Sequence, residues 1–259
     1  MHLKIIACEV ACREIGYVGA YSPHTLDFEF LPVGHHDEPK VGHEDLQARV
    51  DAAAPGRYDA ILIGYGICSA MLDGLSTRHT RLVVPRAHDC ITFFLGSRRR
   101  YQEVFDACPG TYYFTPGWLE FRQRKARTNG EPAPPDNMAS QIAFSMAKDY
   151  EALVAKYGEE NARYLVEVSK TWLQNYRRGM LIRFDFDQKL QLREKVAHIC
   201  QTQGWTMDEL PGDLGLLQRW VDGVWDEADF LIVPPAHAVY PCHQDHIIEA
   251  RPVVGGAPE

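Results

Sequence analysis

The apolar residues of this chain fall in short continuous runs, in which apolar and polar residues do not alternate. Strands with this pattern are buried on both faces, as in parallel sheets covered by helices on either side. Segments with helical periodicity and Gly or Pro breaks separate the runs. The sequence therefore predicts an α/β fold, a Rossmann-like, open, mostly parallel sheet with helices on both faces. The expected strands cover residues 3–10, 28–33, 58–66, 80–86, 111–115, 180–185 and 229–234.

A polar segment with three prolines, residues 125–137, divides the chain and is expected to be a loop or linker. It would separate an α/β half, residues 1–124, from a helical and α/β half, residues 138–240. Two long helices, 138–157 and 159–177, are expected to open the second half. The last residues, 241–259, are expected to form an irregular tail.

One short echo links the two halves. The residues Val84-Pro85-Arg86-Ala87-His88 recur as Val233-Pro234-Pro235-Ala236-His237, each after an apolar strand. The echo is either a chance match or a sign of two similar half-units that face one crevice. In the second case His237 would approach the site that contains His88.

Length and charge narrow the functional classes. The chain has 259 residues and a net charge of −8, whereas nucleic-acid binders present a basic surface, so no nucleic-acid partner is expected. No apolar run reaches about 18 residues, so no membrane span is expected. The first residues lead directly into a strand, without the apolar region of a signal peptide. We therefore expect a cytoplasmic protein whose seven cysteines are reduced thiols or metal ligands.

Two of the expected strands lead into thiols. Cys68 follows the strand at 58–66, and His88 and Cys90 follow the strand at 80–86. The carboxyl ends of parallel strands share one sheet edge, which is where such folds bind ligands. Two thiols and an imidazole are the ligands of a three-residue zinc site with one open position. We therefore expect zinc at Cys68, His88 and Cys90, with the thiolate of Cys90 favoured by the start of its helix.

Other residues near this edge receive supporting roles. Asp89 is expected to hold a ligand imidazole or to cap the helix, and together with Glu9 it is a candidate acid or base. Gly66 lies at a strand-to-helix turn, where a glycine allows a tight turn or the close approach of a cofactor. Gly117 and Trp118 close the strand at 111–115, where the indole would form a wall for a flat ligand or simply pack.

Four other interpretations of the cysteines remain open. Cys8 ends the first strand and is a further candidate ligand at the same edge. With Cys12, Cys68 and Cys90 it would complete the four thiolates of an iron–sulfur cluster. The tail residues Cys242, His243 and His246 also have metal-like spacing. Alternatively, the thiols are buried packing residues, as single cysteines of α/β proteins usually are.

Six segments of the chain match a known family: Gly64-Tyr65-Gly66-Ile67-Cys68, Pro85-Arg86-Ala87-His88-Asp89-Cys90, Leu95-Gly96-Ser97, Thr115-Pro116-Gly117-Trp118, Asn161-Ala162-Arg163-Tyr164 and Phe230-Leu231-Ile232-Val233-Pro234-Pro235. Through these segments, and over nearly its whole length, the chain resembles a family of bacterial and archaeal proteins of uncharacterised function. Members of that family are often found beside corrinoid-dependent methyltransferases and their corrinoid proteins. The resemblance implies methyl transfer or one-carbon metabolism as a context, and it implies no settled activity.

Three functions follow as expectations. The first is a zinc-dependent enzyme that acts on a small-molecule substrate in methyl or one-carbon transfer. The second is an accessory protein that binds a corrinoid, a pterin or a metal for a partner methyltransferase. The third is a metal-free enzyme with Cys90 as the nucleophile and His88 as the base. The sequence leaves the oligomeric state open.

Overall fold

The computed structural model describes residues 1–36, 38–128, 154–155, 158–163, 175–242 and 244–253. The chain forms two compact units, the first from residues 1–101 and 213–259 and the second from residues 102–212. The second unit is thus inserted into the first. This division differs from the predicted halves, 1–124 and 138–240, because a C-terminal strand completes the sheet of the first unit.

The first unit is built on a five-stranded sheet in the order β2-β1-β3-β5-β9. Strands β2, β1, β3 and β5 are parallel, which confirms the predicted α/β class with a mostly parallel sheet. Every residue of β3 and β5 is buried, as their uninterrupted apolar sequences predict. The strands are β1 (His2–Cys8), β2 (Thr25–Leu31), β3 (Ala60–Gly64), β5 (Leu82–Pro85) and β9 (Phe230–Val233).

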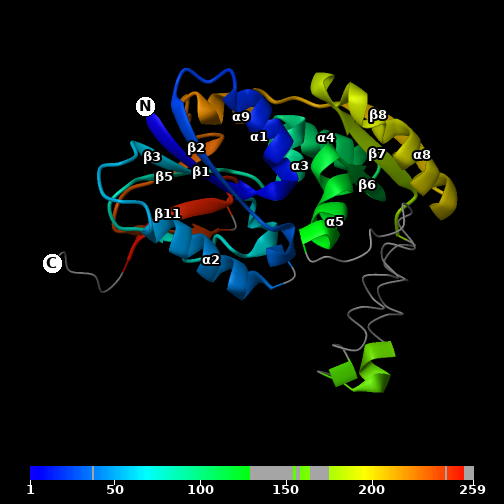
Figure 1. Ribbon diagram of the computed structural model, residues 1–259, viewed down its shortest axis with the longest axis horizontal. Coiled ribbons are helices and arrows are strands. Elements are labelled where there is room, and N and C mark those ends of the chain that lie inside the picture. Colours follow the sequence, from blue (N-terminus) through cyan, green and yellow to red (C-terminus); the bar gives the residue numbers. More distant parts are fainter. Residues whose placement is uncertain (37, 129–153, 156–157, 164–174, 243, 254–259) are drawn as a thin grey trace. The chain divides into compact units, whose positions relative to one another are not determined.

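Helices cover both faces of this sheet. The chain passes from β1 to β2 through α1 (Cys12–Gly19), then from β2 past β1 to β3 through α2 (Pro39–Asp51). Right-handed crossovers that run in opposite directions place their helices on opposite faces. In Figure 1, α1 and α9 (Gly215–Val221) lie on one side of the sheet and α2 on the other. The buried Trp220 of α9 donates its indole N–H to the Val83 carbonyl of β5 at 3.2 Å, which attaches α9 to the sheet.

Strand β9 departs from the parallel pattern. It pairs with β5 in the antiparallel direction, so that Phe230, the first residue of β9, lies opposite Pro85, the last residue of β5. The two echo segments therefore leave the sheet at opposite edges. The expected approach of His237 to His88 across one crevice does not follow from this arrangement.

A second, small sheet of the first unit includes residues of the segment that was expected to be an irregular tail. Its order is β11-β10-β4, and both pairings are antiparallel. The expectation for residues 241–259 is thus wrong at β11, which pairs with the preceding strand over its whole length. The three strands are β4 (Ser76–Thr77), β10 (His237–Pro241) and β11 (Ile248–Pro252).

The second unit has its own parallel sheet, in the order β6-β7-β8. Its core joins Phe114 and Leu181 of the sheet to Val196 and Cys200 of the following helix. Helix α5 continues to Thr128, four residues into the segment expected to be a loop. The other residues of 125–137 and most of the expected helices 138–157 and 159–177 lie outside the described residues. The elements are β6 (Thr111–Phe114), α5 (Pro116–Thr128), β7 (Arg178–Arg183), a 3₁₀ segment η4 (Asp185–Leu190), α8 (Leu192–Gln203) and β8 (Thr206–Pro211).

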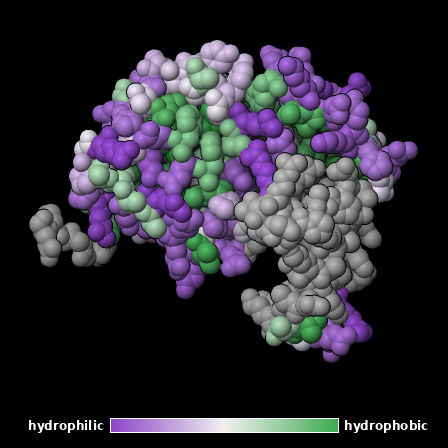
Figure 2. All heavy atoms as spheres, in the orientation of Figure 1, coloured by the Kyte–Doolittle hydropathy of each residue, from purple (hydrophilic) through white to green (hydrophobic). Residues whose placement is uncertain are grey.

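Edge strand β2 carries one exposed apolar residue, Phe28. Phe28 is 43% exposed, and its ring stacks on that of Phe30 at a centroid distance of 6.1 Å. Figure 2 shows apolar residues gathered on this face over β1 and β2. The Phe28 ring lies against Gly19 of α1, where an added methyl group would come within 2.7 Å of it, so α1 covers part of this face of the strand.

Candidate functional site

The strand order of the first unit creates a switch point between β1 and β3. After β1 the next strand, β2, is added on one side of the sheet, and after β3 the next strand of this sheet, β5, is added on the opposite side. Ligands of open α/β sheets bind at such a point, beyond the carboxyl ends of the strands. The residues that follow β1, β3 and β5 there are the 3₁₀ turn η1 (Glu9–Ala11), the 3₁₀ turn η3 (Ile67–Ser69) and α3 (Cys90–Leu95) with the preceding turn.

The loops after β3 and β5 contact each other through their backbones. The amide of Ile67 donates to the Ala87 carbonyl at 3.1 Å, and the amide of Cys68 donates to the His88 carbonyl at 2.8 Å. A Cβ atom added at Gly66 would lie 2.7 Å from the Cα of Asp89, closer than real Cβ contacts. The structure thus places these loops side by side, and the glycine at position 66 is required by the neighbouring backbone.

Four thiols lie around the switch point: Cys8, Cys12, Cys68 and Cys90, which we call the thiol cluster. Burial raises the pKa of the Cys8 thiol to about 12, and the nearby charges of Cys68 and Cys12 raise it further. Burial also raises the pKa of Cys90, and Asp89, Cys68 and Cys8 add to the rise. The four thiols are therefore close enough for their charges to interact, although they come from three separate turns of the chain: Cys8 and Cys12 flank η1, Cys68 lies in η3 and Cys90 begins α3.

The raised pKa of Cys90 differs from the thiolate expected at the start of a helix. The helix α3 has only six residues, so the field at its start is small beside the loss of hydration and the adjacent carboxylate. The neutral thiol is thus the favoured form of Cys90. Cys68, in contrast, is exposed and is the member of the cluster most accessible to solvent.

Asp89 caps α3. Its side chain accepts from the amide of Ile91 at 2.9 Å and from the hydroxyl of Tyr101 at 2.9 Å. Burial raises the pKa of this carboxyl, although both hydrogen bonds and His88 act in the opposite direction. Of the two roles expected for Asp89, capping is the one for which the structure shows a hydrogen bond.

His88 and the thiols are not gathered as tightly as the ligands of a bound metal. His88 is exposed, and its backbone carbonyl accepts a hydrogen bond from the Cys68 amide. Within the described residues, the group of three ligand atoms that lie within 4.8 Å of one another belongs to Cys242, His246 and Glu249. A metal at the expected site would therefore require the His88 ring or the thiols to move.

Two residues near the thiol cluster were not expected. His36 places its Nε2 atom 3.8 Å from the Cys8 sulfur. Tyr65 is 2% exposed, and its hydroxyl has no hydrogen-bond partner in the described part of the chain. Burial raises the pKa of Tyr65, followed by the charge of Cys8. The only sequence signal for Tyr65 is its position between two glycines at a strand end, which did not single out the hydroxyl.

Glu9 lies at the end of β1, as expected. Its Oε1 atom accepts from the amide of Val33 at 2.9 Å, at the start of the 3₁₀ turn η2 (Val33–His36). Glu9 therefore holds the loop after β2 beside the loop after β1. This loop also contains His36, so Glu9 fixes one of the side chains that approach Cys8.

Gly117 and Trp118 belong to the second unit, where they lie in the first turn of α5. The Trp118 indole donates to the Tyr112 hydroxyl at 2.9 Å, and its ring stacks on Phe121 at 5.0 Å. Gly117 is buried. Both contacts of the indole are internal to the unit, which is the packing role that was the alternative to a ligand wall.

The comparisons with known proteins add a family and no activity. A search of the curated proteins and a search of the solved structures both found no match. No helix in the described ranges combines the length and apolar character needed to cross a membrane. One family model matches residues 30–221, which include Cys68, His88 and Cys90. The chain therefore belongs to the family described as protein of unknown function, DUF1638.

Proposed function

We propose that this protein is a cytoplasmic metal-dependent enzyme that acts on a small molecule in methyl or one-carbon transfer. We propose zinc as the metal. The metal would be held by Cys68 and Cys90, with His88 as the nitrogen ligand and Cys8 as a further thiol. The observation that carries the proposal is the coupling of the four thiols at the switch point of the sheet.

The chemistry of the cluster fits a soft metal ion. Thiols that raise one another's pKa repel as thiolates, and a cation removes this repulsion when it binds. The shift at Cys8, from 9.0 to about 12, corresponds to roughly 4 kcal/mol. Zinc binding to structural sites contributes about 10–16 kcal/mol, so it exceeds the cost of deprotonating one such buried thiol.

Zinc held by these residues with one position open would supply a site that binds a substrate thiol as its thiolate, or that polarises a substrate oxygen or nitrogen. In a methyl transfer the methyl–donor bond breaks as the carbon–sulfur bond forms, and the donor atom keeps the electron pair. The unpartnered Tyr65 hydroxyl would hydrogen-bond the ligand, and Asp89 would keep the start of α3 in place. Trp118 and Gly117 have no assigned role in this proposal.

The direction toward methyl transfer comes from the family resemblance. That resemblance implies a context of corrinoid-dependent methyltransferases, and we propose a corrinoid protein or a methyltransferase as the partner. An accessory protein that carries a corrinoid or a pterin for such a partner would be coloured when purified. The raised pKa of Cys90 disfavours a metal-free cysteine nucleophile, because little thiolate forms near neutral pH.

Elemental analysis of the protein purified without chelator tests the proposal. We expect the zinc content to fall by about one ion per chain in Cys68→Ser and in Cys90→Ser, and to fall in His88→Ala. Cys108→Ser is the control, because Cys108 is half-buried in the second unit and is not a member of the thiol cluster. Unchanged zinc in both cluster variants, measured on folded protein, would contradict the proposal.

A four-thiolate iron–sulfur cluster is the second candidate. It is favoured by the inclusion of Cys12 in the coupled group, since such clusters use four cysteines. Iron and acid-labile sulfide in anaerobically purified protein, with visible absorption that Cys12→Ser abolishes, would support it. Zinc that remains in Cys12→Ser and is lost in Cys90→Ser would favour the zinc enzyme.

A further inference from the structure

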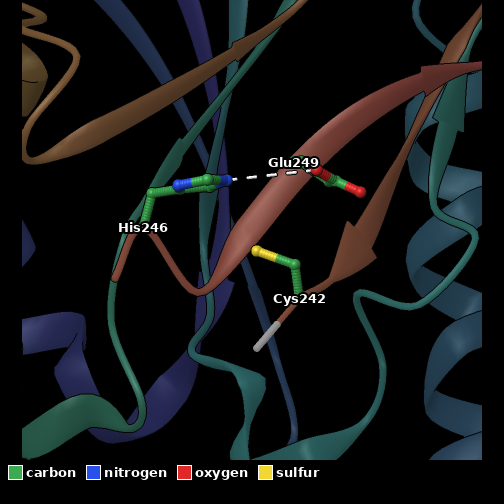
Figure 3. Close-up of side chains that lie close together, drawn as sticks. All are labelled: Cys242, His246 and Glu249. Atoms are coloured by element: carbon green, nitrogen blue, oxygen red, sulfur yellow. Dashed lines mark ion pairs between the residues drawn. The ribbon is translucent and has the colours of Figure 1, made fainter. Parts of the chain in front are cut away.

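A second group of ligating side chains lies at the turn between β10 and β11 of the first unit. Cys242 directly follows β10, His246 lies in the turn, and Glu249 is the second residue of β11. One ligand atom from each of these residues lies within 4.8 Å of the other two, and all three residues are half-buried. Figure 3 shows the imidazole directed at the carboxylate, with the sulfur of Cys242 turned toward the same space.

The backbone of the turn holds these residues in place. The amide of Cys242 donates to the Ile247 carbonyl at 2.8 Å, and the amide of Ile247 donates to the Gln244 carbonyl at 2.8 Å. Ile247 has a φ of 55°, a left-handed conformation that a branched residue rarely adopts. Because Ile247 and Ile248 are buried, the side chains of the turn anchor it on one side while the ligating residues remain at its surface.

Two arginines that are distant in sequence hold the turn through hydrogen bonds to its carbonyls. Arg86, which follows β5, donates to the carbonyls of His246 at 2.8 Å and Ile248 at 2.5 Å. Arg98 donates to the Asp245 carbonyl. The ligand geometry therefore does not depend on the hairpin alone, and the turn is connected to the strand end that leads into His88.

The carboxylate of Glu249 is divided between two partners. Its Oε1 atom accepts from Arg251 Nε at 2.7 Å, whereas its Oε2 atom lies 3.9 Å from His246 Nε2. A distance of 3.9 Å is too long for a hydrogen bond. Two ligands of one tetrahedral zinc ion lie about 3.4 Å apart, given zinc distances of about 2.0–2.2 Å to nitrogen and oxygen. A small movement of one side chain would thus bring both atoms to one ion.

We propose that Cys242, His246 and Glu249 form a second metal site, which binds a divalent ion, zinc by preference, independently of the thiol cluster. A thiolate, an imidazole and a carboxylate are the three ligand types that zinc accepts, and harder ions such as Mg²⁺ avoid thiolates. The ion would join the end of β10 to the start of β11. Arg251 orients the carboxylate through Oε1 and leaves Oε2 for the metal.

The neighbouring charges set the expected strength of the site. Arg86 lies near enough to Cys242 for their charges to interact. Arg86 and Arg251 also repel a cation, and Arg251 offsets the charge of Glu249. We therefore expect zinc to bind here more weakly than in a closed four-cysteine site.

The test uses a background variant, Cys68→Ser with Cys90→Ser, so that the two sites are measured separately. Zinc-free protein of this background is titrated with zinc against a chelating dye, and with cobalt(II) to detect the absorption of a cobalt–thiolate bond. We expect one ion per chain. Adding His246→Ala or Glu249→Gln should weaken binding at least tenfold, and Cys242→Ser should abolish the cobalt–thiolate absorption.

His237→Ala is the matched control, because His237 lies in the same hairpin and outside the ligand group. It should leave the affinity unchanged. A background protein that is folded and takes up no zinc would overturn the proposal, as would equal affinities in His246→Ala and His237→Ala. Zinc lost from the single variants Cys68→Ser and Cys90→Ser reports on the thiol cluster alone. Failure of the proposal for the thiol cluster is therefore distinguishable from failure of the proposal for the second site.

Discussion

Replacement of Gly66 by alanine tests the contact between the loops that carry the thiols. The new Cβ would lie 2.7 Å from the Asp89 Cα, 2.8 Å from the Asp89 nitrogen and 2.9 Å from the His88 carbonyl carbon. These are backbone atoms, so the clash cannot be relieved by rotating a side chain. The φ of Gly66 is −95°, which alanine adopts without strain, and the whole effect is therefore steric.

The size of the effect follows from what must separate. Moving the loops apart weakens two hydrogen bonds, from Ile67 to Ala87 and from Cys68 to His88, at about 1 kcal/mol each. Overpacking of a tight contact adds about 1–3 kcal/mol. We expect Gly66→Ala to lower the free energy of unfolding by about 3–5 kcal/mol. At roughly 2–4 °C per kcal/mol for a domain of this size, the Tm falls by about 6–20 °C.

Thermal unfolding followed by circular dichroism measures this change, with Gly16→Ala as the control. Gly16 lies inside α1 with no atom within 4 Å of an added Cβ, so alanine should stabilise the helix by up to about 1 kcal/mol. A Gly66→Ala protein with the wild-type Tm would refute the backbone contact. If Gly66→Ala loses metal while its Tm is unchanged, the glycine would instead be needed for the close approach of a ligand.

Three further predictions concern single residues. Burial raises the pKa of Asp89, so the folded state holds this proton to a higher pH than the unfolded state. This group therefore makes stability fall as the pH rises above about 4. Asp89→Asn should flatten that fall in urea titrations at a series of pH values, and an unchanged slope would contradict the prediction. In metal-free protein, iodoacetamide at pH 7.5 should label the exposed Cys68 before the buried Cys8, whose pKa is about 12, as read by peptide mass spectrometry; equal labelling rates would argue against a buried thiol. Trp118→Phe removes the hydrogen bond to Tyr112 and should lower stability by about 1 kcal/mol without changing metal content, whereas loss of metal would return the indole to the site.

The sequence predicted the parallel part of the sheet because burial on both faces leaves a direct mark. The uninterrupted apolar runs of β3 and β5 could only belong to covered strands, and their order along the chain brought the segments of Cys68 and His88 to one edge. The direction of β9 could not be predicted, because a short apolar run has the same composition whichever way the strand runs.

The candidate site was predictable in position and not in detail. Strand ends can be located from sequence, but the ionisation of a thiol depends on how deeply folding buries it, which made the expectation for Cys90 wrong. The burial of Tyr65 and the approach of His36 to Cys8 arise from segments that are distant in sequence. The turn of Cys242 and His246 gave a spacing signal, while the third residue of that group, Glu249, is brought to them by the pairing of β10 with β11.

The insertion of one unit into the other has a consequence for biosynthesis. When residue 101 leaves the ribosome, the first unit still lacks β9 and α9, and β5 remains an open edge without the cover of Trp220. At about 5–20 residues per second, synthesis of the inserted unit takes roughly 5–20 s. During that interval the apolar parallel sheet keeps an unpaired edge strand. The nascent chain is thus prone to aggregation until its last strands emerge, and a chaperone would act on it in this interval.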